Sequence, residues 1–176
     1  MVYIKRVEIK NFKSFAKPTV ITFSRGFNAI VGRNGSGKSN IIDALMFVLG
    51  VSKARVLRMR NLDEVVFRPN VKTCKYPPAK RAVVTLYLDN SDELIPINSK
   101  TVTLTREITV DKRSTYRING KLVSKAALVN LLEAINISLE SFNIIPQHRI
   151  NEIVSMNPME VRTLIEEIAG IVTYDK

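Results

Sequence analysis

Residues 30–50 read IVGRNGSGKSNIIDALMFVLG, and this stretch decides the fold class. Its middle part, residues 32–39, matches the pattern GxxxxGK[ST] at every fixed position. In this pattern the glycines let backbone N–H groups approach a phosphate, the lysine reaches the β- and γ-phosphates, and the hydroxyl reaches Mg²⁺. A helix that begins at the same place adds the positive end of its dipole. The stretch therefore predicts a P-loop that binds a nucleoside triphosphate.

The residues on either side of the P-loop predict a strand and a helix. Residues 27–31 (FNAIV) form an apolar run without polar alternation, which is typical of a strand covered on both faces. Residues 39–49 carry apolar side chains at helical spacing, and Gly50 follows where a C-terminal cap belongs. We therefore expect a buried strand, the phosphate loop and a mostly buried helix, in that order.

Alternating or apolar runs elsewhere in the chain predict further strands. They cover residues 2–9, 19–23, 64–67, 82–88, 102–110 and 114–118. Asn119-Gly120 is the dipeptide that favours a type I′ turn, so the last of these strands should enter a tight hairpin.

Two further helices are indicated by their start signals. Ser124 is placed to cap a helix over residues 126–135, and Asn157-Pro158 with Glu160 forms a capping-box-like start for another. The order of strands, P-loop helix, long antiparallel stretch and helices predicts an α+β arrangement around a P-loop core. At 176 residues we expect a single domain, residues 1–176.

The composition limits the functional classes. The chain has 27 Lys and Arg against 16 Asp and Glu, a net charge of +11, which is typical of nucleic-acid binding unless an acidic second lobe neutralises it. No apolar run approaches the roughly 18 residues that span a membrane, and the N-terminus lacks signal-peptide features, so a soluble, cytosolic protein is expected. A single Cys74 and a single His148 exclude an internal disulfide and leave little for a four-ligand metal site.

Hydrolysis of the nucleotide requires carboxylates that the chain does not clearly supply. A Mg²⁺-binding carboxylate normally follows an apolar strand, with a group that orients water nearby. Asp89 follows the run at residues 83–88, but turn-forming residues come next, so a loop aspartate is the preferred interpretation. Asp63 and Glu64 precede their predicted strand instead of following it. The nucleotide cradle is present and the hydrolytic carboxylates are missing.

Four segments resemble the N-terminal head segment of SMC (structural maintenance of chromosomes) ATPases. They are KNFKSF (residues 10–15), GRNGSGKSNIIDA (residues 32–44), FNIIPQ (residues 142–147) and LIEEIAGIVTYD (residues 164–175). The resemblance implies a split ABC-type ATPase, with a mixed sheet, an antiparallel β-subdomain and a P-loop helix. This chain would be its N-terminal lobe, with a coiled coil beginning at about residues 170–176. A C-terminal lobe would then carry the signature motif, Walker B and the catalytic glutamate.

The same resemblance implies roles for individual residues. Gln147 matches the Q-loop glutamine that contacts Mg²⁺ and water, and Ser39 would be the other Mg²⁺ contact. Arg58 matches an arginine that approaches ATP and DNA, although Arg60 lies close enough to be confused with it. Together with Lys38, Gln147 and Arg58 form the implied catalytic set. The implied ATP contacts are Lys13, Ser14, Gly32, Arg33, Asn34, Gly35, Ser36, Gly37, Lys38, Ser39 and Asn40.

The chain departs from the family pattern at two places. Arg33 stands where the family more often has a small residue or proline, and His148-Arg149 replaces the commoner Gly-Asp. We interpret His148 as a loop histidine and not as a catalytic base. The partners implied by the resemblance are the C-terminal lobe, a second head bound across ATP, a kleisin-type subunit and DNA contacted through its phosphates. The implied role is chromosome organisation in the cytoplasm, at the nucleoid.

Three other hypotheses remain open from the sequence. A zinc-hook repair ATPase would share the P-loop, but the ending IAGIVTYD argues against it. A self-contained kinase or GTPase should carry its own carboxylates, and a GTPase should show an NKxD motif, which is not present. A DNA-binding module without enzymatic activity would have no need of a P-loop.

Overall fold

The computed structural model describes residues 2–69, 75–135, 137 and 156–168. The chain divides into two units, Met1–Asn136 and Ile137–Lys176. The helices and strands of the first unit are β1 (Ile4–Lys10), β2 (Thr19–Thr22), α1 (Lys38–Val48), β3 (Arg81–Asp89), β4 (Thr101–Thr109), β5 (Ser114–Ile118), β6 (Lys121–Val123) and α2 (Lys125–Ala134). Two short 3₁₀ helices, η1 (Ala54–Leu57) and η2 (Leu62–Val65), follow α1. The second unit contains α4 (Pro158–Ile168).

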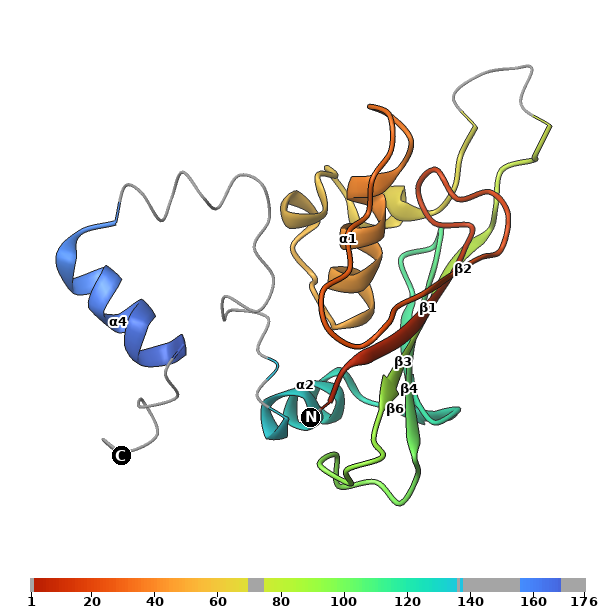
Figure 1. The fold of residues 1–176 in the computed structure, drawn as a ribbon. Helices are drawn as coiled ribbons and strands as arrows, with labels where there is room; N and C mark the ends of the chain where they lie inside the picture. Colours follow the sequence, from red (N-terminus) through yellow and green to blue (C-terminus); the bar gives the residue numbers. More distant parts are fainter. Residues whose placement is uncertain (1, 70–74, 136, 138–155, 169–176) are drawn as a thin grey trace. The chain divides into compact units, whose positions relative to one another are not determined.

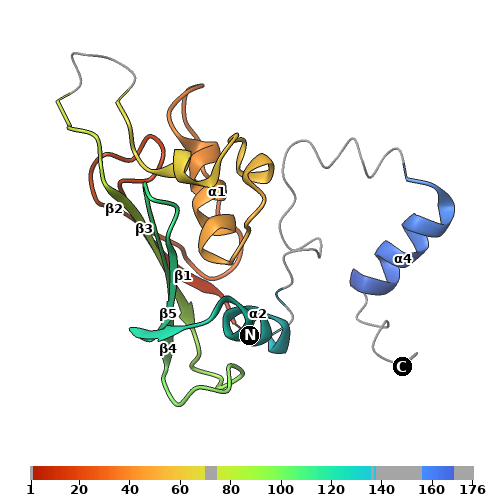
Figure 2. The ribbon, with the colours of Figure 1, turned by 180° about the vertical axis from the view of Figure 1, so that it is seen from behind.

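The six strands of the first unit form one antiparallel sheet in the order β2-β1-β3-β4-β5-β6. Buried and half-buried residues alternate along β3 and β4, as expected for strands with one covered face. Figures 1 and 2 show α1 and α2 on the same side of this sheet. The strand predictions for residues 2–9, 19–23, 82–88, 102–110 and 114–118 are confirmed within one to two residues at their ends.

A buried arginine joins the sheet to α1. Arg106 of β4 is almost fully buried and donates to the carbonyls of Phe47 and Val51, at 2.8 and 2.7 Å, at the end of α1. Its guanidinium also lies over the rings of Phe47 and Tyr116. Desolvation by burial lowers the pKa of Arg106 below its ordinary value. Arg106 thus adds a charged donor to the Phe47 carbonyl, which also accepts from the backbone of Gly50 at 3.1 Å, and places positive charge at the C-terminal end of α1.

The predicted hairpin and helix starts are confirmed. Asn119 and Gly120 have φ angles of 47° and 79°, the positive values that a type I′ turn requires. Ser124 caps α2 by accepting a hydrogen bond from the backbone of Ala127 at 3.1 Å. In the second unit, the side chain of Asn157 accepts from the backbone of Glu160 at 3.0 Å, and the Glu160 carboxylate accepts from the backbone of Asn157 at 2.8 Å. This reciprocal pair is a capping box at the start of α4.

Two strand predictions are wrong. Residues 27–31 form no strand, and Phe27 and Val31 are 94% and 87% exposed. Among the described residues no segment pairs with them, so the two-sided burial that the apolar run predicted is not reached. Residues 64–67 also form no strand. Glu64 accepts hydrogen bonds from the backbones of Arg60 and Asn61, at 3.2 and 3.3 Å, and this local bonding favours the 3₁₀ helix η2.

None of the helices in the described parts of the chain combines the length and the apolar character needed to cross a membrane.

Candidate nucleotide-binding site

The P-loop leads into α1 through glycines that no other residue could replace without strain. Gly35 and Gly37 have φ angles of 78° and 95°, and Gly37 is the N-cap of α1. A Cβ atom on Gly37 would lie 3.3 Å from Oγ of Ser14, and one on Gly32 would lie 2.9 Å from Oγ of Ser36. No side chain among the described residues caps this end of α1. The start of α1 therefore presents backbone N–H groups that none of the described side chains caps, a geometry that suits an anion.

Lys38 and Ser39, the polar residues of the P-loop motif, begin α1. The Lys38 Nζ atom donates to the carbonyls of Gly32 and Arg33, at 2.7 and 2.8 Å, so the amino group lies against the loop. Ser39 is exposed, as are the loop residues Arg33 and Asn34. This geometry places a positive charge and an accessible hydroxyl at the start of the helix, and both fit a Mg²⁺–triphosphate group.

The loop at residues 11–15 packs along α1, from Phe47 near its C-terminal end to Asn40 near its start. Phe12 is fully buried, and its ring lies 5.2 Å from that of Phe47, which anchors the loop in the core beneath α1. Lys13 adopts a positive φ of 48°, and its backbone N–H donates to the carbonyl of Val65 at 2.7 Å. The anchored phenylalanine thereby sets the position of the two polar residues that follow it, Lys13 and Ser14.

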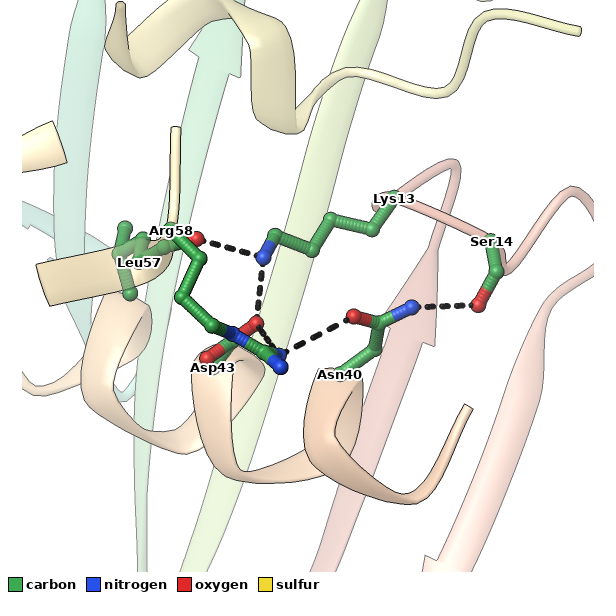
Figure 3. Close-up of polar contacts among 6 residues, drawn as sticks. All are labelled: Lys13, Ser14, Asn40, Asp43, Leu57 and Arg58. Atoms are coloured by element: carbon green, nitrogen blue, oxygen red, sulfur yellow. Dashed lines mark hydrogen bonds and ion pairs between the residues drawn. The ribbon is translucent and has the colours of Figure 1, made fainter. Parts of the chain in front are cut away.

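A cluster of polar side chains joins this loop, α1 and the segment after η1 (Figure 3). Both Lys13 and Arg58 form ion pairs with the same oxygen of Asp43, Oδ2. Lys13 also donates to the carbonyl of Leu57 at 2.6 Å. Desolvation by burial lowers the pKa of Lys13, although hydrogen bonding and charge attraction from Asp43 oppose this shift. Two cations therefore share one buried carboxylate.

Asn40, in the first turn of α1, links this cluster to Ser14. Its amide nitrogen donates to Oγ of Ser14 at 2.8 Å, and its amide oxygen lies 3.5 Å from an Nη atom of Arg58. Figure 3 shows Asn40 between the two. We call Lys13, Ser14, Asn40, Asp43 and Arg58 the Asp43 cluster. The structure thus brings Lys13, Ser14, Asn40 and Arg58, all expected ATP contacts or catalytic residues, to one place next to the P-loop.

The remaining predicted positions fall elsewhere. Gln147, His148 and Cys74 lie outside the described residues, as does the stretch 170–176. Asp89 ends β3 and accepts from Oγ of Ser91 at 3.0 Å. In Figures 1 and 2 this end of β3 lies opposite to the start of α1. Asp89 is thus the last residue of a strand, where the sequence predicted a loop aspartate, and it also pairs with Lys5 at 3.0 Å.

Asp43 is the site residue that the sequence did not single out. It lies in the middle of α1 and is buried, with 3% of its side chain exposed. A usable signal was present, because an aspartate on the buried face of an apolar helix needs a charged partner. The partners themselves could not be read from the sequence, since Lys13 and Arg58 come from two other segments.

Comparison with known proteins decides the family. The RecF/RecN/SMC N terminal domain family matches residues 3–143. The Chromosome partition protein Smc of Pyrococcus furiosus is 42% identical over 176 residues, which cover 99% of this chain and 15% of that protein. This chain belongs to the SMC family. It spans about one seventh of the length of curated relatives such as the Pyrococcus furiosus protein.

Solved structures agree with this family and with the expected fold. An Smc head domain from Pyrococcus furiosus, with an extended coiled coil and bound to the C-terminal domain of ScpA, superposes with a TM-score of 0.91 at 42% identity. The match covers 99% of this chain and 44% of that one. A second chain, from work on ATP-driven dimerization and DNA stimulated activation of SMC ATPases, gives a TM-score of 0.86 at 40% identity. Here the match covers 94% of this chain and 99% of the other. The fold is that of an SMC head, an ABC-type P-loop ATPase.

Proposed function

We propose that this chain is the ATP-binding half of an SMC head. A C-terminal lobe of the same protein completes the head, a second head binds across ATP, and the assembly hydrolyses ATP while acting on DNA in chromosome organisation. The observation that carries the proposal is the complete P-loop at the start of α1, with the Asp43 cluster beside it. A simple DNA-binding module would have no use for this arrangement.

The P-loop residues have distinct roles in the proposal. Backbone N–H groups at Gly35 and Gly37 bind phosphate oxygens, Lys38 neutralises the β- and γ-phosphates, and Ser39 binds Mg²⁺. Gln147 would be the second Mg²⁺ contact and would orient the attacking water. The structure supports the first group by its geometry, and the role of Gln147 depends on the family resemblance alone.

Two observations support the assignment of this chain as half of a head: the greater length of its relatives and an uncovered apolar segment. The relatives are about seven times longer, and Phe27 and Val31 present apolar side chains with no cover among the described residues. An exposed apolar run next to the P-loop is expected where another lobe packs. We therefore infer that the C-terminal lobe covers residues 27–31 and brings the catalytic carboxylates.

The further partners follow from the relatives and from charge. One related head binds a domain of ScpA, so a kleisin-type subunit is a proposed partner of the complete protein. With a net charge of +11, the chain is suited to DNA phosphates, and such binding would be salt-sensitive and independent of sequence. The proposed location is the cytoplasm, on the chromosome.

Equilibrium binding of a fluorescent ATP analogue with Mg²⁺ tests the proposal. The purified chain should bind weakly, and Lys38→Ala should weaken binding by about tenfold or more, because a charge-assisted contact to phosphate is lost. Lys121→Ala, at an exposed lysine of β6, is the matched control and should bind like the unmodified chain. Equal binding by all three proteins would show that the P-loop does not hold the nucleotide.

A further inference from the structure

The Asp43 cluster contains more positive charge than it can neutralise. Lys13 and Arg58 both pair with Oδ2 of Asp43, and these three charges sum to +1. A single carboxylate with one committed cation is already neutral. One of the two cations is therefore in excess, and it can leave without stranding a buried charge.

The two cations differ in how firmly they are held. The Lys13 side chain is 5% exposed and has a second acceptor, the carbonyl of Leu57 at 2.6 Å. The Arg58 side chain is 43% exposed, and its second acceptor, the amide oxygen of Asn40, lies at the limiting distance of 3.5 Å. If Lys13 broke its ion pair, both its amino group and the Asp43 carboxylate would stay buried away from solvent. The Arg58 side chain, in contrast, already reaches the surface. Arg58 is the cation that can be released.

The backbone at Arg58 supports the same assignment. Its φ of 57° ends the 3₁₀ helix η1, and the carbonyl of the preceding residue, Leu57, is fixed by Lys13. The main chain at the base of Arg58 is thus anchored through Lys13, while the guanidinium is held only by its contacts with Asp43 and Asn40. Asn40 connects the guanidinium to the first turn of α1, which begins at the P-loop. A bound triphosphate at the P-loop would be a nearby anion of higher charge than Asp43.

We propose that Asp43 is a positioning residue that holds Arg58 away from the nucleotide until a triphosphate competes for it, while Lys13 keeps Asp43 paired after Arg58 leaves. The inference depends on the function proposed above, in which Arg58 contacts ATP. Asp43 then opposes nucleotide binding by a small amount, because the Asp43–Arg58 ion pair must be broken before Arg58 can reach a phosphate. A residue that served only to hold the fold together would instead favour binding.

A double-mutant cycle in the complete head tests this competition. Asp43→Asn keeps the shape of the side chain and weakens the hold on Arg58, so MgATP should bind about threefold to fivefold more tightly. In the background of Arg58→Gln the same Asp43→Asn change should leave the affinity unaltered, because no arginine remains to be released. Any effect that acts through Lys13 or through the fold would persist in that background.

The outcomes separate the two proposals. If the unmodified head does not bind MgATP, the proposed function fails. If it binds and Asp43→Asn weakens binding, or changes it equally with and without Arg58, the competition is refuted while the function stands.

A measurement without substitution covers the case in which Asp43→Asn does not fold. In the unmodified head with labelled arginine and lysine side chains, MgATP should shift the NMR signal of the Arg58 guanidinium and leave that of the Lys13 amino group in place. An unmoved Arg58 signal, or an equal shift of both, would overturn the proposal.

Discussion

The sheet and the segment at residues 27–31 belong to the same unit, and both are rich in apolar residues. Strands β3 and β4 have neighbours on both sides, and their core-facing side chains, such as Val84 and Leu104, are fully buried. Phe27 and Val31, in a run that is more uniformly apolar, lie almost entirely in solvent. The difference shows that an apolar run favours burial but becomes buried only where another element packs against it. The sheet finds its partners within the chain, and the segment does not find them among the described residues.

The largest effect is expected where the sheet is joined to α1. Arg106→Met should lower the free energy of unfolding by about 2 to 4 kcal/mol, because the carbonyls of Phe47 and Val51 lose a buried donor. Urea unfolding measures this change in the free energy of unfolding. The control is Arg117→Met in β5, whose ion pair with Glu107 at 3.7 Å is partly exposed and should cost under about 1 kcal/mol. Equal losses would mean that the sheet does not depend on Arg106 for its contact with α1.

The second prediction concerns the incomplete segment. Phe27→Ser should change the unfolding free energy of the chain alone by less than about 0.5 kcal/mol, because the ring is already in water. It should weaken association with the C-terminal lobe by about tenfold or more, since burial of a phenylalanine contributes about 2 kcal/mol. Titration of the labelled chain with that lobe gives the affinity. Leu122→Ser, at another exposed apolar residue, is the control and should not affect association. If it weakens association as much as Phe27→Ser does, residues 27–31 are not the specific contact with the C-terminal lobe.

The third prediction compares Gly37 of the P-loop with Gly26, a glycine outside the P-loop that has a similar φ angle. Gly37→Ala and Gly26→Ala place a side chain at φ angles of 95° and 85°, so each should cost about 1 kcal/mol of stability. Only Gly37 has a neighbour in the way, Oγ of Ser14 at 3.3 Å, whereas nothing lies within 4 Å of a Cβ at Gly26. ATP binding should therefore weaken about tenfold for Gly37→Ala alone. If Gly26→Ala weakens ATP binding as much, general destabilisation explains the loss.

The smallest effect is expected at the end of β3. A hydrogen bond from Lys5, whose Nζ lies 3.0 Å from Asp89, holds the pKa of this carboxyl below its ordinary value of 3.8. The ionised form thus stabilises the fold above pH 3.8, and this contribution is lost as the pH falls through the lowered pKa. Asp89→Asn should melt below the unmodified chain at pH 7, with a gap that closes toward pH 2. A gap that stays constant with pH, or that appears equally in Asp111→Asn at an exposed aspartate, would contradict this origin.

The sequence predicted the parts of the fold that depend on neighbouring residues. Alternation located β3, β4 and β5, the dipeptide Asn119-Gly120 located the hairpin, and Ser124 located the start of α2, because each signal acts within a few residues. The two strand errors have different causes. Residues 27–31 depend on a partner that the run itself does not specify. Residues 64–67 form no strand because Glu64 bonds to the backbones of Arg60 and Asn61, a local interaction that competed with the strand pattern.

The site was predictable as a list of residues but not as an arrangement. The P-loop pattern predicted the start of α1, and the family resemblance named Lys13, Ser14, Asn40 and Arg58. Lys13 and Arg58 meet at the carboxylate of Asp43, through contacts between residues 30 and 15 positions apart. Such contacts are set by the packing of Phe12 beneath α1, and no local pattern encodes that packing.

ATP turnover tests the central claim, that this chain is half of an active site, most directly. The chain should hydrolyse almost no ATP alone and should gain turnover when the C-terminal lobe of the same protein is added, while a mixture made with Lys38→Ala stays inactive and one made with Lys121→Ala does not. Turnover at an ordinary enzyme rate by the chain alone, abolished by Lys38→Ala, would contradict the account, because the catalytic carboxylates would then lie within these residues.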